Sequence, residues 1–339
     1  MNVNNFEHAK VSIILPVYNG ERFLSDSINS ILNQTHTNWE LIIVNDCSTD
    51  GTLKIISEFA LNDSRILIIN NDENKKLPAS LNIGHKIASG DYISWTSDDN
   101  IYQPFAFSQY LKYLNDNQCD IVYSDFDLIN SEGQVLKRRT LLEPENLING
   151  NYVGASFLYK REVFESLDGY NENLFLVEDY DFWLRAFTKF KFKYIPDSLY
   201  FYRTHAESLS SQIVCDSHKN ILWRKNVYFM YENFLSHYTL ENKWFASFFT
   251  NQLTHQPFSI DVFLNKKKEF LMFINKIASH SLVNENNIRL AFKEKLIHLL
   301  VNNHEKKHTY KLSYLIIIIF WKELRKNDLK KLLKYSFFK

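Results

Sequence analysis

Short runs of aliphatic residues alternate with longer amphipathic stretches over the first hundred residues. Buried strands are predicted at 11–15, 39–44, 66–69 and 92–96, with Pro16 closing the first. Helices are predicted between them at 21–32, 52–60 and 77–88, where apolar residues recur at helical spacing. Because parallel strands need crossover connections of this length, the alternation predicts a mostly parallel sheet flanked by helices.

The pattern loosens after Pro104. We predict a strand at 121–124, a turn at 130–133, strands at 155–159 and 199–203, and a helix that includes 180–187. From about residue 216 the spacing of apolar residues is helical, with stripes within 221–235 and 270–277. The chain therefore reads as an α/β domain at 11–212, preceded by a tail at 1–10 and followed by a helical region at 213–339.

Three loops follow predicted strands at the edge of the sheet where ligands usually bind. They read Pro-Val-Tyr-Asn at 16–19, Asn-Asp-Cys-Ser-Thr-Asp-Gly at 45–51 and Ser-Asp-Asp-Asn at 97–100. Taken singly, each loop has an ordinary explanation, because Asp, Asn, Ser and Gly form turns and cap helices. Taken together, they indicate a cation site: the adjacent carboxylates of Asp98 and Asp99 repel each other unless a cation or strong donors relieve them.

Oxygen ligands at a strand end suit Mg²⁺ or Mn²⁺, which keep coordination positions open for phosphate oxygens. Such an ion would hold a diphosphate at the edge of the sheet. Asp46, one loop away, could then accept a hydrogen bond from a base or a ribose.

Composition excludes several classes of protein. Hydrophobic residues make up 45% and charged residues 23% of the 339 residues, as in an ordinary globular protein. Lys plus Arg and Asp plus Glu number 39 each, so the basic excess of a nucleic-acid-binding protein is lacking. Three cysteines favour a reducing compartment over a disulfide scaffold. Residues 1–10 lack the apolar core of a signal peptide, and the apolar run at 314–321 is too short to cross a bilayer. We therefore expect a cytoplasmic protein.

The C-terminal segment is basic although the whole chain is neutral. Residues 304–339 hold ten Lys and Arg against three acids. Its apolar positions follow a helical stripe, but further apolar residues occupy the other side as well. One interpretation is a helix packed against other helices. The alternative is peripheral contact with a membrane, with anionic headgroups bound by Lys322, Arg325, Lys326, Lys330, Lys331 and Lys334.

Further motifs occur in order along the chain: Leu-Asn-Ile-Gly at 81–84, Ala-Ser-Gly-Asp-Tyr-Ile at 88–93, Gly-Tyr-Asn-Glu at 169–172, Glu-Asp at 178–179 and Tyr-Arg-Thr-His-Ala-Glu-Ser-Leu-Ser at 202–210. With the three loops, they make residues 10–210 resemble the inverting glycosyltransferases of family 2, which have the GT-A fold. The resemblance implies a nucleotide-binding half at 11–100 and an acceptor half at 101–212. It also implies a nucleotide-sugar donor, usually a UDP-sugar, and Mn²⁺ or Mg²⁺ as cofactor. The acceptor would be a glycan or lipid-linked glycan of the capsule or lipopolysaccharide type, and a homo-oligomer is left open.

Carried over by position, the resemblance implies that Asp179 is the catalytic base, with Glu178 beside it. It makes Asp99 the direct metal ligand and turns Asp98 toward the ribose or a bound water. It lets His205 complete the metal site or touch the diphosphate. Nucleotide-sugar binding is implied for Pro16, Val17, Tyr18, Asn19, Asp46, Ser48, Lys76, Asn82, Ser97 and Asp98.

Three residues depart from the family pattern. Asn45 stands where an acid is usual, Cys47 stands where a glycine is usual, and Ser97 stands where the Asp-x-Asp motif has an acid. The departures bear on the geometry of the second loop, on the donor and on how Asp98 and Asp99 divide their roles.

The residue types suit an inverting hexosyl or N-acetylhexosaminyl transfer, which needs one base and a stabilised diphosphate but no covalent nucleophile. Two other functions remain open. One is a catalytically silent nucleotide-sugar-binding or assembly module of the same fold. The other is a nucleotidyltransferase, although the loop after the first strand lacks the glycine-rich, basic phosphate loop usual there. Outside this context, Glu178 and Asp179 could simply complement a helix dipole and His205 could be a structural histidine.

Overall fold

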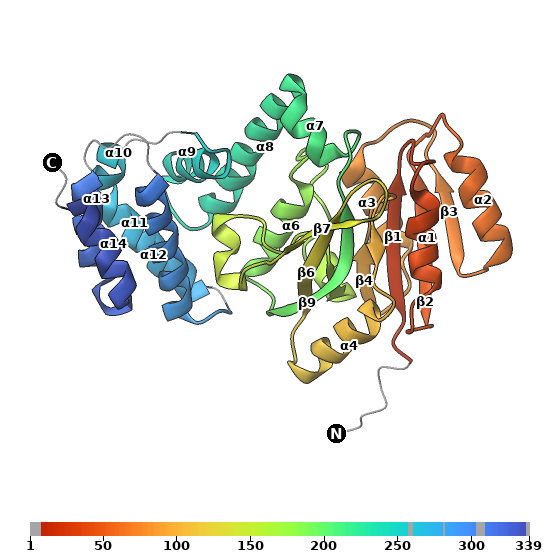
Figure 1. The fold of residues 1–339 in the computed structure, drawn as a ribbon, viewed down its shortest axis with the longest axis horizontal. Coiled ribbons are helices and arrows are strands. Elements are labelled where there is room, and N and C mark those ends of the chain that lie inside the picture. Colours follow the sequence, from red (N-terminus) through yellow and green to blue (C-terminus); the bar gives the residue numbers. More distant parts are fainter. Residues whose placement is uncertain (1–7, 257–259, 281, 303–308, 337–339) are drawn as a thin grey trace. The chain divides into compact units, whose positions relative to one another are not determined.

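The computed structural model describes residues 8–256, 260–280, 282–302 and 309–336 (Figure 1). Two compact units divide the chain. The first, called here the sheet unit, comprises residues 1–143, 152–186 and 190–223, and the second, the helical unit, comprises 144–151, 187–189 and 224–339. The division in the second half of the chain falls within one long helix, α8 (Ser217–Ser236). Most of the predicted N-terminal tail lies outside the described residues.

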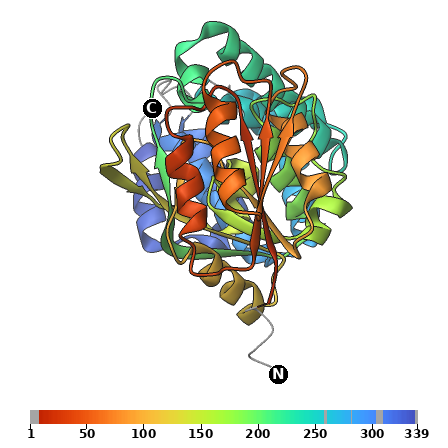
Figure 2. The same ribbon diagram turned by 90° about the vertical axis from the view of Figure 1, so that its right-hand side faces the viewer.

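The first half of the sheet unit is a regular parallel α/β structure. Its elements are β1 (Val11–Val17), α1 (Leu24–Leu32), β2 (Trp39–Asn45), α2 (Thr52–Asn62), β3 (Ile66–Asn70), α3 (Leu77–Ile87) and β4 (Tyr92–Trp95). The strands lie parallel in the order β3-β2-β1-β4. Helices α1 and α2 run along one face of the sheet (Figures 1 and 2). Strand β4 lies on the opposite side of β1 from β2, so α3, which connects β3 to β4, runs along the other face. The predicted α/β fold is confirmed.

Two predicted boundaries in this half are wrong. The first strand continues through Pro16 to Val17 and pairs with β2 along its whole length. Pro16 is tolerated because the pairing of β1 with β4 already ends at Ile14, so the missing N–H costs no ladder hydrogen bond. Helix α1 begins at Leu24 rather than at Glu21, because the Glu21 carboxylate is used to accept a hydrogen bond from the Gly51 amide (2.6 Å).

The second half of the sheet unit extends the same sheet with mixed pairings. It contains β5 (Ile101–Tyr102), α4 (Ala106–Asp116), β6 (Ile121–Ile129), β7 (Val135–Arg139), β8 (Phe157–Lys160), α5 (Arg161–Ser166), α6 (Glu178–Phe187), β9 (Phe192–Arg203) and α7 (Leu209–Cys215). The complete sheet has nine strands in the order β3-β2-β1-β4-β8-β6-β9-β5, with β7 paired to β6. Strand β8 is antiparallel to both neighbours, whereas β9 is parallel to β6 and ends at the same edge of the sheet. Strand β9 thereby delivers its C-terminal residues to the edge that carries the loops of the first half.

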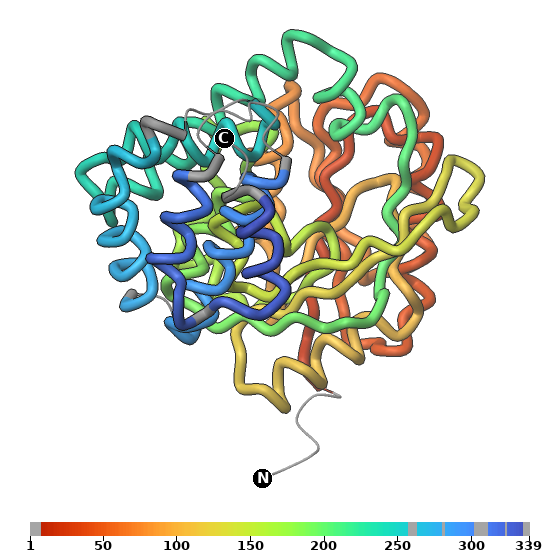
Figure 3. The backbone as a smooth tube through the Cα atoms, turned by 60° about the vertical axis from the view of Figure 1, so that its left-hand side comes forward, coloured from red at the N-terminus to blue at the C-terminus, as the bar shows by residue number. Residues whose placement is uncertain are grey.

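The helical unit contains η1 (Pro144–Asn149), most of α8, α9 (Asn242–Leu253), α10 (Ile260–Asn265), α11 (Lys267–His280), α12 (Glu285–Asn302), α13 (Thr309–Ile319), η2 (Trp321–Glu323) and α14 (Lys326–Ser336). Phenylalanine side chains of α9 to α12 pack on one another in its core, among them Phe245, Phe248, Phe270, Phe273 and Phe292. Helices α13 and α14 lie side by side (Figure 3). None of the described helices is long and apolar enough to cross a membrane.

Candidate active site

Loops after β1 and β2 are joined into one surface at the carboxyl edge of the sheet. The Asn19 amide donates to Ser48 Oγ (3.0 Å), and Asn19 Oδ1 accepts from the Thr49 amide (2.8 Å). The Gly20 amide donates to Thr52 Oγ1 (2.9 Å). The structure therefore brings together Asn19 and Ser48, two of the predicted donor-binding residues. Of the other predicted residues in this region, Pro16 and Val17 are buried in β1, and Tyr18 is 52% exposed.

Cys47 takes the conformation of the glycine that it replaces. Its φ is +63°, in the left-handed region that side chains rarely adopt. The neighbouring Asn45 supports the turn, because its Oδ1 accepts from the Ser48 amide (3.1 Å) and its Nδ2 donates to Asn70 (2.9 Å). The second loop thus keeps a left-handed turn despite the two departures from the family pattern.

Asp46 holds the segment that leads into α3. Its Oδ1 accepts from Asn71 Nδ2 (2.8 Å) and from the Lys75 amide (2.8 Å), and its Oδ2 accepts from the Lys76 amide (3.0 Å). Lys76, with φ of +72°, precedes the first residue of α3 and leaves its side chain exposed. The buried carboxylate of Asp46 therefore shapes this loop, and its contact with a nucleotide stays a prediction.

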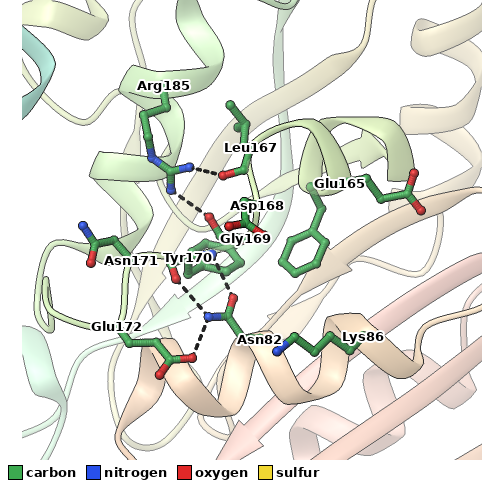
Figure 4. A pocket seen from close by; sticks show the side chains of 11 residues that line it. Asn82, Lys86, Glu165, Leu167, Asp168, Gly169, Tyr170, Asn171, Glu172 and Arg185 are labelled. Carbon is green, nitrogen blue, oxygen red and sulfur yellow. Dashed lines mark hydrogen bonds between the residues drawn. The ribbon is translucent and has the colours of Figure 1, made fainter.

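Asn82 lies in the middle of α3 and anchors the loop that precedes α6 (Figure 4). Its Oδ1 accepts from the Tyr170 amide (2.8 Å), and its Nδ2 donates to the Tyr170 carbonyl (2.9 Å) and to Glu172 Oε1 (3.0 Å). Arg185 holds the same loop from α6 through the carbonyls of Leu167 and Gly169. A cavity of about 630 Å³ lies between α3, this loop and α6, and Lys86 and Glu165 also line it. Asn82 thus acts on the loop that leads to Glu178 and Asp179.

Asp98 is packed directly on the backbone of Gly20. A Cβ atom at position 20 would lie 2.1 Å from Asp98 Oδ2, so only glycine fits there. Burial, followed by the charge of Asp99, raises the pKa of Asp98 to about 7. The loop itself is held by Ser27, whose hydroxyl donates to the Ser97 carbonyl (2.9 Å). Asp98 therefore keeps its proton more readily than an ordinary aspartate.

Asp99 and His205 meet at this edge although 106 positions separate them along the chain. Asp99 Oδ2 lies 2.9 Å from His205 Nε2, and the hydrogen bond to Asp99 raises the pKa of the histidine. The other oxygen of Asp99, Oδ1, is buried and has no hydrogen-bond partner among the described residues. A buried carboxylate oxygen of this kind is costly unless something else relieves it.

Within the described part of the chain, no three side chains of His, Cys, Asp or Glu form a complete metal site. The buried Oδ1 of Asp99, which has no hydrogen-bond partner among the described residues, nevertheless suits Mg²⁺ or Mn²⁺ as a single carboxylate ligand. These ions are commonly held by one or two carboxylates, with phosphate oxygens and water as the remaining ligands.

Arg203 positions the Asp99 loop and was not predicted from the sequence. Its side chain is buried, with Nε donating to the Asp99 carbonyl (2.9 Å) and Nη2 to Asp26 (2.9 Å). Its backbone amide donates to Asn100 Oδ1 (2.8 Å), and its guanidinium lies 4.5 Å from the centre of the Phe23 ring. The motif that supplied His205 also contains Arg203, but a buried arginine cannot be told from an exposed one by its place in a motif.

Glu178 and Asp179 form the first turn of α6, behind a strained residue. Leu176 has φ of +77°, which is unusual for a bulky side chain and is typical of functional sites. Glu178 is buried, and its Oε2 has no hydrogen-bond partner among the described residues. Burial and the charge of Asp179 together raise the pKa of Glu178. Burial therefore favours the protonated form of Glu178.

Tyr202 connects the two acidic groups. Burial raises the pKa of its hydroxyl, and the negative charges of Asp99 and Asp179 raise it further. The hydroxyl is 2.8 Å from Ser210 Oγ. Both aspartates are close enough to Tyr202 to act on the pKa of its hydroxyl. Tyr202 lies in a motif noted in the sequence, and its side chain is half-buried.

Comparisons with known proteins find glycosyltransferases. The family described as glycosyl transferase family 2 matches residues 12–169. EpsE of Bacillus subtilis (strain 168), named as a glycosyltransferase, is 35% identical over 207 residues, which are 59% of this chain and 74% of EpsE. An uncharacterized glycosyltransferase of Rickettsia conorii is 32% identical over 235 residues, or 65% of this chain. The match spans only 38% of that relative's length.

Among solved structures, the crystal structure of S. aureus TarS 1–349 in complex with UDP-GlcNAc resembles this chain with a TM-score of 0.59. The likeness covers 96% of this chain and 90% of the TarS fragment, at 16% sequence identity. At this identity the likeness concerns the fold. It extends the comparison beyond the family match into the C-terminal helices.

Proposed function

The chain belongs to glycosyl transferase family 2, and from its site we propose that it transfers a sugar from a nucleotide-diphosphate sugar to a hydroxyl group of a glycan. One observation carries the proposal most. The carboxylate of Asp99, at the carboxyl edge of the sheet, has a buried oxygen with no hydrogen-bond partner among the described residues and suits a cation that binds a diphosphate. A transfer also needs a base, and we propose Asp179, in the first turn of α6, for this role.

We propose a UDP-sugar as the donor, in keeping with the UDP-GlcNAc bound by the structurally similar TarS. The surface made by Tyr18, Asn19 and Ser48, with Asp46 and the exposed side chain of Lys76 beside it, would receive the nucleotide. Ser97 and Asp98 would line the side nearest the ribose. The hydrogen bonds between the first and second loops support this role, because they fix the surface before a ligand arrives.

A divalent cation, Mn²⁺ or Mg²⁺, would be held by Asp99, with His205 and Asp98 beside it. When bound, the ion neutralises charge on a departing diphosphate. Arg203 acts through the loop: by donating to the Asp99 carbonyl, it fixes the segment that carries both acids. Gly20 lets the Asp98 carboxylate pack on the backbone.

Asp179 would accept the proton of the acceptor hydroxyl. In the proposed inverting step, a bond forms between the acceptor oxygen and the anomeric carbon while the bond from that carbon to the diphosphate oxygen breaks. The proton passes to Asp179, and the electron pair leaves with the nucleoside diphosphate. We assign the base to Asp179 rather than to Glu178, because burial raises the pKa of Glu178 and so favours its protonated form.

The acceptor class that we propose is a cell-envelope glycan or a lipid-linked glycan, used on the cytoplasmic side. The three free cysteines agree with a reducing compartment. A catalytically silent nucleotide-sugar-binding module is the main alternative. It predicts donor binding without turnover, and the strained backbone of Leu176, two residues before Glu178, argues against it because such strain usually persists for a function.

A donor screen tests the proposal. The full chain is mixed with UDP-, GDP- and dTDP-sugars, with and without Mn²⁺, and thermal stabilisation and release of nucleoside diphosphate are measured. We expect UDP-sugars to stabilise the protein only with Mn²⁺ and to be slowly hydrolysed. Stabilisation without any hydrolysis or transfer would favour the silent module. No response to any nucleotide sugar would contradict the proposal.

A further inference from the structure

We propose that the hairpin of α13 and α14 docks on an anionic membrane surface through an apolar stripe formed by Tyr314, Ile318 and Trp321. The proposal concerns the helical unit alone and does not depend on the proposed function. Its evidence is an exposed apolar face, the fixed packing of the opposite face, and a set of exposed cations on the neighbouring helix.

Three large apolar residues are left uncovered on α13 and the turn after it. Tyr314 is 65% exposed, Ile318 is 58% exposed and Trp321 is 66% exposed. Spacings of four and three residues place side chains on one face of a helix. On a helix that simply faces water, this uncovered strip would carry polar residues. Here the strip is as apolar as the buried face.

The orientation of α13 is set by packing inside the helical unit. Leu312, Ile316 and Phe320 are fully buried on its other side. Arg289 of α12 donates to the Ile319 carbonyl (3.0 Å), and its guanidinium lies 5.6 Å from the centre of the Phe320 ring. Because the buried face is already occupied, α13 cannot rotate to bury the stripe. An external surface is needed to cover it.

Cations are frequent on α14, which packs beside α13. Lys326, Lys330 and Lys334 recur every four residues along α14, and all three are exposed. Lys322, Arg325 and Lys331 are exposed as well. The one acidic residue of α14, Asp328, binds partners inside the helical unit. Its Oδ2 accepts hydrogen bonds from the buried Lys293 Nζ (2.7 Å) and from the Arg325 amide (3.0 Å). The exposed cations are therefore not neutralised by Asp328.

This combination favours a membrane surface over other occupants. Trp and Tyr side chains settle at the boundary between headgroups and acyl chains, and exposed Lys and Arg side chains bind anionic headgroups. A second copy of the chain would bring the lysines of two hairpins together across a symmetric interface, at an electrostatic cost. None of the described helices is long and apolar enough to span a bilayer, and we propose contact with its surface.

Vesicle co-sedimentation of the full chain tests the proposal. The vesicles are phosphatidylcholine alone, or three parts phosphatidylcholine with one part phosphatidylglycerol. We expect the protein to sediment with the anionic vesicles at low salt, to be released at high salt, and to stay in solution with neutral vesicles. Equal sedimentation with both vesicle types would overturn the proposal, because the cations would then have no part in binding.

Three variants sharpen the test. Replacing Tyr314, Ile318 and Trp321 together with glutamine should lower the apparent affinity for anionic vesicles at least tenfold. Lys326→Gln, Lys330→Gln and Lys334→Gln together should lower it severalfold and weaken the salt dependence. Met272→Gln is the matched control, because Met272 is 71% exposed on α11 of the same unit and carries no role here.

Circular dichroism and donor hydrolysis without vesicles show whether the variants remain folded and active. Both should be unchanged by the stripe variant, so loss of vesicle binding is separable from loss of the proposed activity. Unchanged vesicle binding by the stripe variant would overturn the proposal. So would a wild-type protein that ignores vesicles but forms dimers that the stripe variant abolishes, since the stripe would then bind a second copy.

Discussion

Two groups of buried acids in the sheet unit differ in how their oxygens are satisfied. Glu40 accepts from Lys10 Nζ (2.7 Å), Ser12 Oγ (2.6 Å) and the Ser89 amide (2.6 Å), and Asp46 is likewise surrounded by donors. At the candidate active site, one oxygen of Asp99 and one of Glu178 have no hydrogen-bond partner among the described residues. Acids whose oxygens all accept hydrogen bonds hold loops in place. Acids with a buried oxygen that accepts none can bind a cation or transfer a proton.

The largest expected effect comes from Asp179→Asn. We expect turnover to fall about 100- to 10,000-fold, because the acceptor proton loses its base, while donor affinity stays within about twofold of wild type. Steady-state transfer rates and donor titration measure the two quantities. Asp168→Asn, at an exposed position of the same unit, is the matched control and should change neither. Loss of donor binding in Asp179→Asn would move this residue from the base to the binding surface.

Arg203→Met should cost about 3 kcal/mol of unfolding free energy, since it leaves Asp26 and the carbonyls of Asp99 and Ser131 without their donor. Denaturant unfolding measures the loss. Arg203→Met also releases the Asp99 loop, so Mn²⁺-dependent activity should fall. The control Arg65→Met removes the ion pair between Arg65 and Asp63 and should lower activity less. An Arg203→Met protein that folds and keeps the wild-type dependence of its activity on Mn²⁺ would show that Arg203 is not needed to position the Asp99 loop.

Glu40→Gln should destabilise the fold by about 2 kcal/mol and leave donor binding unchanged. Burial would raise the pKa of Glu40, but hydrogen bonds from Lys10, Ser12 and Ser89 outweigh it and lower the pKa from 4.5 to about 2. The stabilisation is therefore complete above pH 4.5 and is lost as the pH falls toward 2. Wild-type and variant melting curves should converge over this window. A constant difference would mean that the charge of Glu40 does not contribute.

The smallest effects concern His205 and Cys47. The hydrogen bond to Asp99 raises the pKa of His205, so a proton competes with a cation to higher pH than for an ordinary histidine. Apparent Mn²⁺ affinity should then rise severalfold between about pH 6 and about pH 8, and His205→Asn should flatten this profile.

Cys47→Gly should change the unfolding free energy by less than about 1 kcal/mol, because relief of the left-handed strain is offset by a more flexible unfolded chain.

The first half of the fold could be predicted well from the sequence, and the second half less so. Strands β1 to β4 are buried and regularly spaced by helices, so the pattern of apolar residues marks them. Strand β7 is exposed along its whole length, and β5 has two residues, so neither has a pattern that distinguishes it from a loop. Helix α4 was also missed, although Tyr110, Leu111 and Leu114 are buried along it.

At the site, sequence analysis identified the acids but not what surrounds them. The pairing of Asp99 with His205 followed from the family resemblance, since nothing local joins residues so far apart. The sequence could not show that Asp46 and Asn82 use their polar atoms on neighbouring loops, or that the buried Arg203 donates to the Asp99 carbonyl. The position of Arg203 depends on the pairing of β6 with β9, which brings the end of β9 to the carboxyl edge.

Calorimetric titration of Mn²⁺ into the full chain, with and without UDP, tests the central claim most directly. We propose that the unpartnered oxygen of Asp99 binds a cation that also binds a diphosphate. UDP should then tighten Mn²⁺ binding at least tenfold, and Mn²⁺ should tighten UDP binding by the same factor. Asp99→Asn should abolish this coupling while Glu40→Gln preserves it. Mn²⁺ binding of equal strength with and without UDP, or undiminished coupling in Asp99→Asn, would contradict the account.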